Sequence, residues 1–145
     1  MRIVVAALVA VFVWSASHQA GAETVLERGT YLVRGIVACG NCHTPQTPDG
    51  PQTGMEMAGM LIADEAAFTA YAANITPDRE TGIGAWSDAD LGRAIREGIR
   101  PDGSLIGPPM PIGLYRGISD DDLAAIIAYV RSVPAVRNKV PKSVY

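Results

Sequence analysis

The chain has 145 residues, a formal net charge of −3, and 48% hydrophobic and 19% charged residues. This length and composition predict one ordinary globular domain, without room for a second core. The acidic balance and the scattered arginines exclude the clustered basic face of a nucleic-acid-binding protein.

Residues 1–22 have the pattern of a secretory signal peptide. Arg2 precedes twelve apolar residues, Ile3 to Trp14, and Ala20-Gly21-Ala22 has the small-x-small pattern of a cleavage site. The apolar run is shorter than the roughly 20 residues of a membrane-spanning helix. We therefore expect export to the periplasm and a mature domain at 23–145. The alternative is an uncleaved anchor extended through residues 15–17, which would hold the protein at the membrane.

The first predicted element of the mature domain is an amphipathic helix over residues 24–38. Its apolar positions recur at helical spacing: Val25, Leu26, Leu32, Val33 and Ile36. Gly29 lies within this apolar stripe, where it costs about 1 kcal/mol relative to Ala. A glycine on the buried face lets another backbone approach closely, so we expect another helix to cross there.

The middle of the mature domain is rich in turn residues. Residues 44–63 contain three prolines and three glycines, which predict a loop. Residues 64–73 are predicted to form a short helix, and residues 74–84 are again typical of turns. No pattern in the chain predicts a strand.

Two later helices have the same start signal. Ser87 is followed three positions later by Asp90, and Ser119 by Asp122, an acidic variant of the capping box. The first helix is expected to end at Gly98 and the second before Pro134. A glycine- and proline-rich loop over residues 99–118 joins them. The predicted fold is all-α, with three to five helices and long loops.

The strongest motif follows the first helix: Cys39-Gly40-Asn41-Cys42-His43. Two thiols at this spacing can form thioethers with the two vinyl groups of one haem, and the adjoining imidazole can then bind the iron. A structural zinc site would need four ligands. The motif offers two cysteines and one histidine, and the chain has no second cysteine pair, so this interpretation fails. A disulfide or a redox-active pair would leave His43 unexplained, and the βαβ setting of a thioredoxin-like motif is missing. We therefore predict one covalent haem c.

The second axial ligand is predicted to be Met110. After cleavage of the signal His43 is the one histidine left, so the remaining candidates are methionines. Prolines on both sides fix the backbone of Met110 in an extended form, and it follows His43 by 67 residues, enough chain to reach the other haem face. Methionines usually fill cores, which is the interpretation for Met55, Met57 and Met60. Ligation by imidazole and thioether leaves no open position on the iron, which indicates a relay rather than an enzyme.

The order of these features resembles the class I cytochrome c fold. More narrowly, several segments look like the cytochrome subunits of bacterial membrane alcohol and aldehyde dehydrogenases: residues 74–78, 82–86, 109–111 and 123–132. The resemblance implies that Cys39 and Cys42 attach haem, with His43 as the proximal and Met110 as the distal ligand. It also implies a near-perpendicular crossing of the first and last helices. Those subunits carry three haem modules, whereas this sequence has one.

Several other residues have two possible roles. Trp86 either donates its indole N–H to a haem propionate or packs beside Leu91. Arg93, Arg96 and Arg100 either neutralise propionates or, as favoured by their spacing, form a solvated helix face. His43 is expected to donate its other ring nitrogen to a carbonyl of the proline-rich loop.

Three functions remain open on the sequence alone. The first is an electron shuttle between a dehydrogenase and an oxidase or another cytochrome. The second is a stoichiometric subunit of a dehydrogenase complex, and the third is a ligand-binding haem sensor or catalyst with an open iron position. The chain has two lysines, Lys139 and Lys142, so partner binding is expected to depend weakly on salt.

Overall fold

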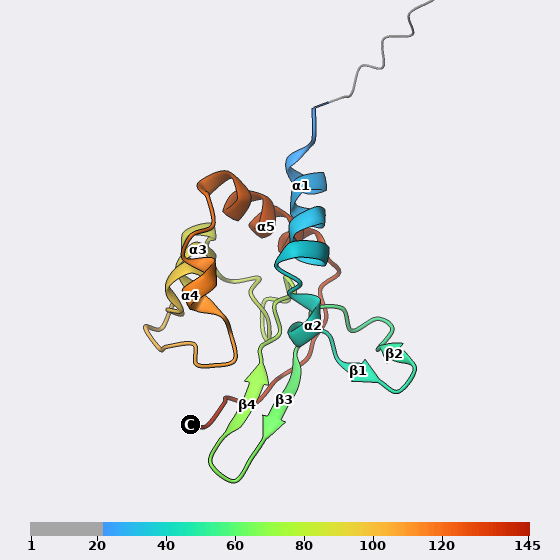
Figure 1. Ribbon diagram of the computed structural model, residues 1–145. Helices are drawn as coiled ribbons and strands as arrows, with labels where there is room; N and C mark the ends of the chain where they lie inside the picture. The colour runs from blue at the N-terminus through green and yellow to red at the C-terminus, as the bar shows by residue number, and fades with distance from the viewer. Residues whose placement is uncertain (1–21) are drawn as a thin grey trace, which may run out of the picture.

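The computed structural model describes residues 22–145, which form short α-helices, one π-helix and two small antiparallel sheets (Figure 1). Apart from Ala22, the predicted signal peptide lies outside these residues. Among them, no helix has the length and apolarity needed to cross a membrane. In chain order the elements are α1 (Val25–Tyr31), η1 (Leu32–Ile36), α2 (Gly40–His43), β1 (Gln46–Thr47), β2 (Gly50–Pro51), β3 (Met60–Asp64), β4 (Thr69–Ala72), α3 (Asp88–Glu97), α4 (Ile112–Tyr115) and α5 (Asp120–Ser132).

The core lies where α5 crosses α1 and η1 (Figure 1). Gly29 makes this crossing close, as predicted, because a Cβ built on it would collide with the carbonyl oxygen of Ala125. The Arg28 guanidinium pairs with Asp122 across the two helices at 2.7 Å. The predicted first helix therefore exists, but it continues beyond Tyr31 as a π-helix.

We expect Gly29→Ala to destabilise the protein by about 1–3 kcal/mol, because the added methyl group collides with a backbone carbonyl that cannot rotate away. Denaturant unfolding of the haem-loaded protein measures the change in free energy. Gly35→Ala is the matched control, since a Cβ at Gly35 meets nothing within 4 Å. Equal stability of both variants would contradict the close crossing.

The two predicted capping signals are confirmed. Ser87 and Asp90 form a reciprocal capping box, and α3 ends at Gly98 in the left-handed conformation, with φ 71°. The Ser119 hydroxyl accepts from the Asp122 N–H at the start of α5, which ends before Pro134.

The prediction of an all-α fold is wrong for residues 46–72. The predicted helix over residues 64–73 is instead the end of β3, a turn and β4, paired from Met60↔Ala72 to Asp64↔Thr69. A smaller hairpin, β1–β2, turns at Pro48-Asp49. Long-range pairing overrides local helix propensity here, because β4 also pairs with the C-terminal segment at Thr69↔Val144.

Candidate functional site

A cavity of about 430 Å³ lies between α2, the β3–β4 sheet, α3 and the loop that leads into α4. Its volume falls within the range of small-molecule and cofactor sites. The walls are largely apolar and include Ile75, Ile83, Leu91, Ala94, Ile95, Ile126 and Val130. The cavity is thus continuous with the hydrophobic core.

The predicted haem-binding residues all line this cavity: Cys39, Cys42, His43, Trp86 and Met110. The first three come from the turn around α2, and Met110 comes from a loop far along the chain. Met57, by contrast, is a core residue with 2% of its surface exposed, as predicted. Met55 and Met60 are half-buried and are not part of the cavity wall.

The His43 ring is oriented by the backbone that follows β4. Nδ1 lies 2.7 Å from the carbonyl oxygen of Ala73, and since a carbonyl oxygen only accepts, Nδ1 carries the proton and donates. This leaves Nε2 as the nitrogen with a free lone pair. Desolvation lowers the pKa of His43, which favours the neutral, ligating form.

The carbonyl that holds His43 was predicted to lie in the proline-rich loop, and this prediction is wrong. That loop holds the backbone of His43 instead, because the Gly59 N–H donates to the His43 carbonyl oxygen at 2.7 Å. The ring partner, Ala73, directly follows β4, a strand that the sequence pattern did not reveal. Only long-range pairing of β4 brings its carbonyl to the cavity.

The two cysteines differ in their surroundings. Cys39 packs against the core, and burial raises the pKa of its thiol to about 11. Cys42 is exposed, and neither residue forms a disulfide. Ala38 precedes them with φ 51°, a left-handed conformation that is uncommon for a residue other than glycine. This turn directs the chain from η1 into α2, where both thiols reach the cavity.

The three arginines of the predicted helix face, Arg93, Arg96 and Arg100, differ in their surroundings. Arg93 pairs with Asp90, and Arg96 pairs with Asp120 at 2.7 Å. Arg100 alone among these three lines the cavity, and its guanidinium donates to the carbonyl of Leu105. Of the three, Arg100 is therefore the one placed to meet an acidic group of a ligand.

The packing interpretation of Trp86 agrees with the structure. Trp86 lines the cavity and packs against the core, in the same wall as Leu91. The Arg131 guanidinium, which also pairs with Asp88, donates to its carbonyl oxygen at 2.8 Å. A contact between the indole N–H and a propionate stays a prediction.

Several wall residues gave no signal in the sequence pattern. Tyr115 donates its hydroxyl to the Val37 carbonyl oxygen at 3.1 Å, and burial raises the pKa of Tyr115 to about 12. Ile62 is the extra residue where the β3–β4 register shifts, and it also lines the cavity. Ser143 and Tyr145 reach the wall from the C-terminal segment.

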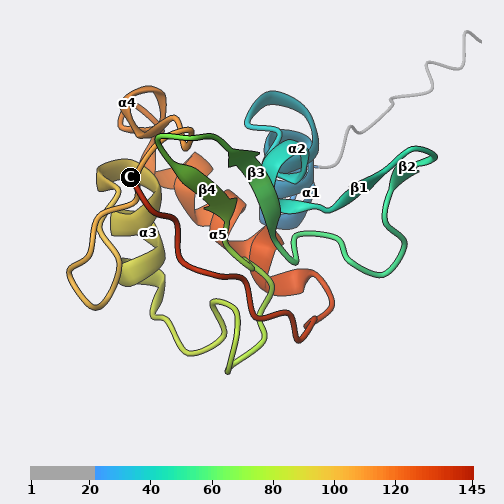
Figure 2. The ribbon, with the colours of Figure 1, turned by 90° about the horizontal axis from the view of Figure 1, so that it is seen from below.

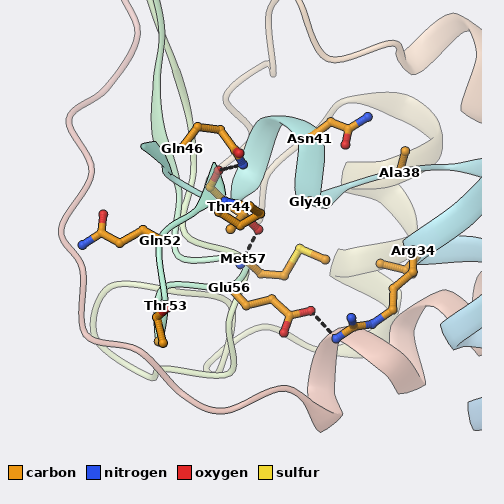
Figure 3. Close-up of a pocket in the computed structure, with 13 residues that line it drawn as sticks. Arg34, Ala38, Gly40, Asn41, Thr44, Gln46, Gln52, Thr53, Glu56 and Met57 are labelled. Carbon is orange, nitrogen blue, oxygen red and sulfur yellow. Dashed lines mark hydrogen bonds and ion pairs between the residues drawn. The ribbon is translucent and has the colours of Figure 1, made fainter. Parts of the chain in front are cut away.

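A second hollow lies beside α2 and contains neither a cysteine nor a histidine (Figure 3). The Arg34–Glu56 ion pair crosses part of it at 2.7 Å, and the Thr44 hydroxyl accepts from the Met57 N–H at 3.0 Å. These contacts join the proline-rich loop to η1 and to the haem-binding turn. They support the backbone of α2 rather than add ligands to the cavity.

The donor set of the cavity matches the requirements of covalent haem. Two thiols, a neutral imidazole with its free nitrogen and a thioether lie on the walls of one apolar cavity. This combination defines the candidate site of a c-type cytochrome.

Comparisons with known proteins agree with this class. The chain is 42% identical over 128 residues to a nicotinate dehydrogenase subunit of Pseudomonas putida, covering 88% of this chain and 10% of that protein. It is 38% identical over 138 residues to the cytochrome c subunit of alcohol dehydrogenase (quinone) from Gluconobacter oxydans, covering 92% and 27%. It is 36% identical over 107 residues to the gluconate 2-dehydrogenase cytochrome c subunit of Pantoea cypripedii, covering 74% and 23%. No protein-family model matches the chain.

The chain therefore matches one cytochrome c module of bacterial dehydrogenase subunits. It spans 10%, 27% and 23% of these three relatives.

Proposed function

We propose that this protein is a one-electron carrier that holds one haem c in the cavity, in a class I cytochrome c fold. Cys39 and Cys42 form the thioethers, His43 is the proximal ligand and Met110 the distal ligand. The observation that carries the proposal is the convergence of these four side chains on one apolar cavity. When bound, the haem supplies an iron that alternates between two oxidation states.

Residues of the protein influence the electron transfer at the iron. The Ala73 carbonyl fixes the His43 tautomer, and the largely apolar walls would surround the bound haem. A thioether opposite an imidazole raises the potential of the iron relative to harder ligands. His43 and Met110 would hold the iron from the protein and leave no position for a substrate, which supports a relay rather than an enzyme.

We place this function in the periplasm, after removal of residues 1–22. The support is the charged residue, apolar run and small-x-small site at the N-terminus. The proposed donor is a dehydrogenase, by similarity to the named relatives, and the proposed acceptor is an oxidase or another cytochrome.

The surface around the Met110 loop suits a short-lived partner contact. Leu105 and Leu114 lie on either side of Met110 in sequence and are 74% and 80% exposed. Six arginines pair with carboxylates: Arg28, Arg34, Arg93, Arg96, Arg131 and Arg137. Exposed apolar side chains are therefore available for docking, next to Arg116, which is exposed and takes part in none of these six ion pairs.

Carbon monoxide distinguishes a relay from a ligand-binding haem protein. We expect the reduced, haem-loaded protein to keep its spectrum under carbon monoxide, because His43 and Met110 occupy both axial positions. We also expect it to be reoxidised by membranes of its host, with less than about a threefold change in rate between low and physiological ionic strength. Rapid carbon monoxide binding would contradict the carrier and favour a sensor or catalyst.

Co-purification then separates two forms of the carrier. When the tagged, full-length protein is purified, a free shuttle is recovered alone. A subunit of a complex is recovered together with an equal amount of a dehydrogenase. The names of the relatives favour the second form.

A further inference from the structure

The C-terminal segment, residues 143–145, joins two walls of the cavity, one that orients His43 and one that carries Met110 (Figure 2). One wall is β4 and the residue after it, Ala73, whose carbonyl holds the His43 ring. The other is the loop of residues 107–111, which carries Met110. The deep red end of the chain returns from α5 to lie against β4 in both views (Figures 1 and 2).

On the His43 side, the segment is held by backbone pairing. Thr69 and Val144 exchange both of their N–H···O bonds, at 2.9 and 2.8 Å. The Ser143 hydroxyl accepts from the Tyr71 N–H at 2.9 Å and donates to the Tyr71 carbonyl oxygen at 3.3 Å. The segment thus acts as a third strand beside β4.

The approach to this segment is also fixed upstream. The buried Asn74 side chain donates to the Val136 carbonyl oxygen at 2.7 Å, and the Thr81 hydroxyl accepts from the Asn138 N–H at 3.0 Å. The Asn138 side chain donates to the Ala58 carbonyl oxygen at 2.8 Å. The chain after α5 is therefore anchored before it reaches the cavity.

On the Met110 side, one side chain makes the connection. The Tyr145 hydroxyl donates to the Pro108 carbonyl oxygen at 2.6 Å, and its ring stacks on Phe68 with centroids 6.4 Å apart. The ring also lies directly on Gly107, where an added Cβ would come within 2.5 Å of ring carbons. Gly107 thus provides the close approach that the tyrosine needs.

We propose that Tyr145 is a positioning residue that ties the Met110 loop to β4 and so holds the methionine sulfur against the iron. The inference rests on the proposed ligation by His43 and Met110. Glycine and proline make up residues 107–109, and no helix or strand contains Met110. The loop therefore depends on contacts from outside itself, and the Tyr145 hydrogen bond joins it to the same strand that leads to the His43 partner.

Imidazole binding to the oxidised, full-length, haem-loaded protein tests this role, since imidazole binds only where the sulfur leaves. Replacement of the methionine sulfur by imidazole is monitored by the loss of the sulfur–iron charge-transfer band in the near infrared. We expect Tyr145→Phe to raise imidazole affinity about two- to fivefold, the size of one partly exposed hydrogen bond. Tyr145→Ala also loses the ring contacts, and we expect an increase of about tenfold or more. Tyr31→Ala, an exposed tyrosine on α1, is the control.

A glycine pair tests the same contact from the loop. Gly107→Ala should push the Tyr145 ring away and raise imidazole affinity, whereas Gly113→Ala should leave it unchanged, because a Cβ at Gly113 meets nothing within 4 Å. Thermal unfolding is measured in parallel. A merely structural role for Tyr145 would lower the unfolding temperature without changing imidazole affinity.

The outcomes separate this inference from the proposed function. Higher affinity in the Tyr145 and Gly107 variants, with unchanged controls, supports the positioning role. Unchanged affinity in Tyr145→Ala, in a protein whose wild type shows the sulfur–iron band, overturns this inference alone. A wild type without that band overturns the Met110 ligation and with it the inference.

Discussion

Replacing Cys39 and Cys42 together by Ala is expected to abolish accumulation of the haem-loaded protein in cells that mature c-type cytochromes. Both thiols line the cavity, and without them no covalent link holds the haem against its walls. The apolar side chains of those walls would then lose their contacts with the haem: Ile75, Ile83, Leu91, Ile126 and Val130.

The size of this effect follows from the energetics of burial. Each fully buried aliphatic side chain contributes about 1.5–3 kcal/mol relative to an exposed one. A domain's net stability is about 5–15 kcal/mol, so losing the haem contacts of several wall residues would remove a sizeable part of it. The loop at residues 99–111, which lines the cavity through Arg100 and residues 106–111, would lose the group on which it packs.

Mass spectrometry and a haem stain of the exported polypeptide measure the result. Each single variant keeps one thioether and is expected to accumulate at about a tenth of the wild-type level or less. Asn41→Ala is the matched control, because it alters the same turn and keeps both thiols and His43. Normal haem content in the double cysteine variant would disprove covalent attachment.

Features set by local chemistry were predictable from the sequence. The Ser87–Asp90 capping box and the left-handed Gly98 depend on a few residues at known spacing. The haem-binding motif is equally local. The motif follows the first helix as predicted, whereas the short helix α2, which contains Cys42 and His43, was not predicted. Gly29 marked a close crossing, but its partner Ala125 lies far along the chain.

The β3–β4 sheet could not be predicted in this way, because its stability comes from distant residues. Residues 63–73 are rich in alanine, which favours helix, yet Thr69 pairs with Val144, which lies near the end of the chain. The Ala73 carbonyl at the His43 ring depends on that pairing. The short helix α4 was missed for a similar reason, since it forms within a loop whose contacts to α3 come from the fold.

Replacing Met110 by Ala is expected to lower the reduction potential and abolish the sulfur–iron charge-transfer band. Met110 is the methionine that lines the cavity, together with His43 and both cysteines. Loss of the thioether removes the ligand that favours the reduced iron. We expect a decrease of roughly 0.1–0.3 V, a fraction of the about 0.8 V that axial ligands span. The reduced variant should also bind carbon monoxide.

The other methionines supply the controls for this experiment. Met55 and Met60 are half-buried and outside the cavity wall, so Met55→Ala and Met60→Ala should keep the band and the potential. Met57 is unsuitable as a control because it is 2% exposed and its loss would open a cavity in the core. If the band survives in Met110→Ala and is lost in Met60→Ala, the ligand is Met60. In that case the loop of residues 107–111 would have to hold the haem by packing alone.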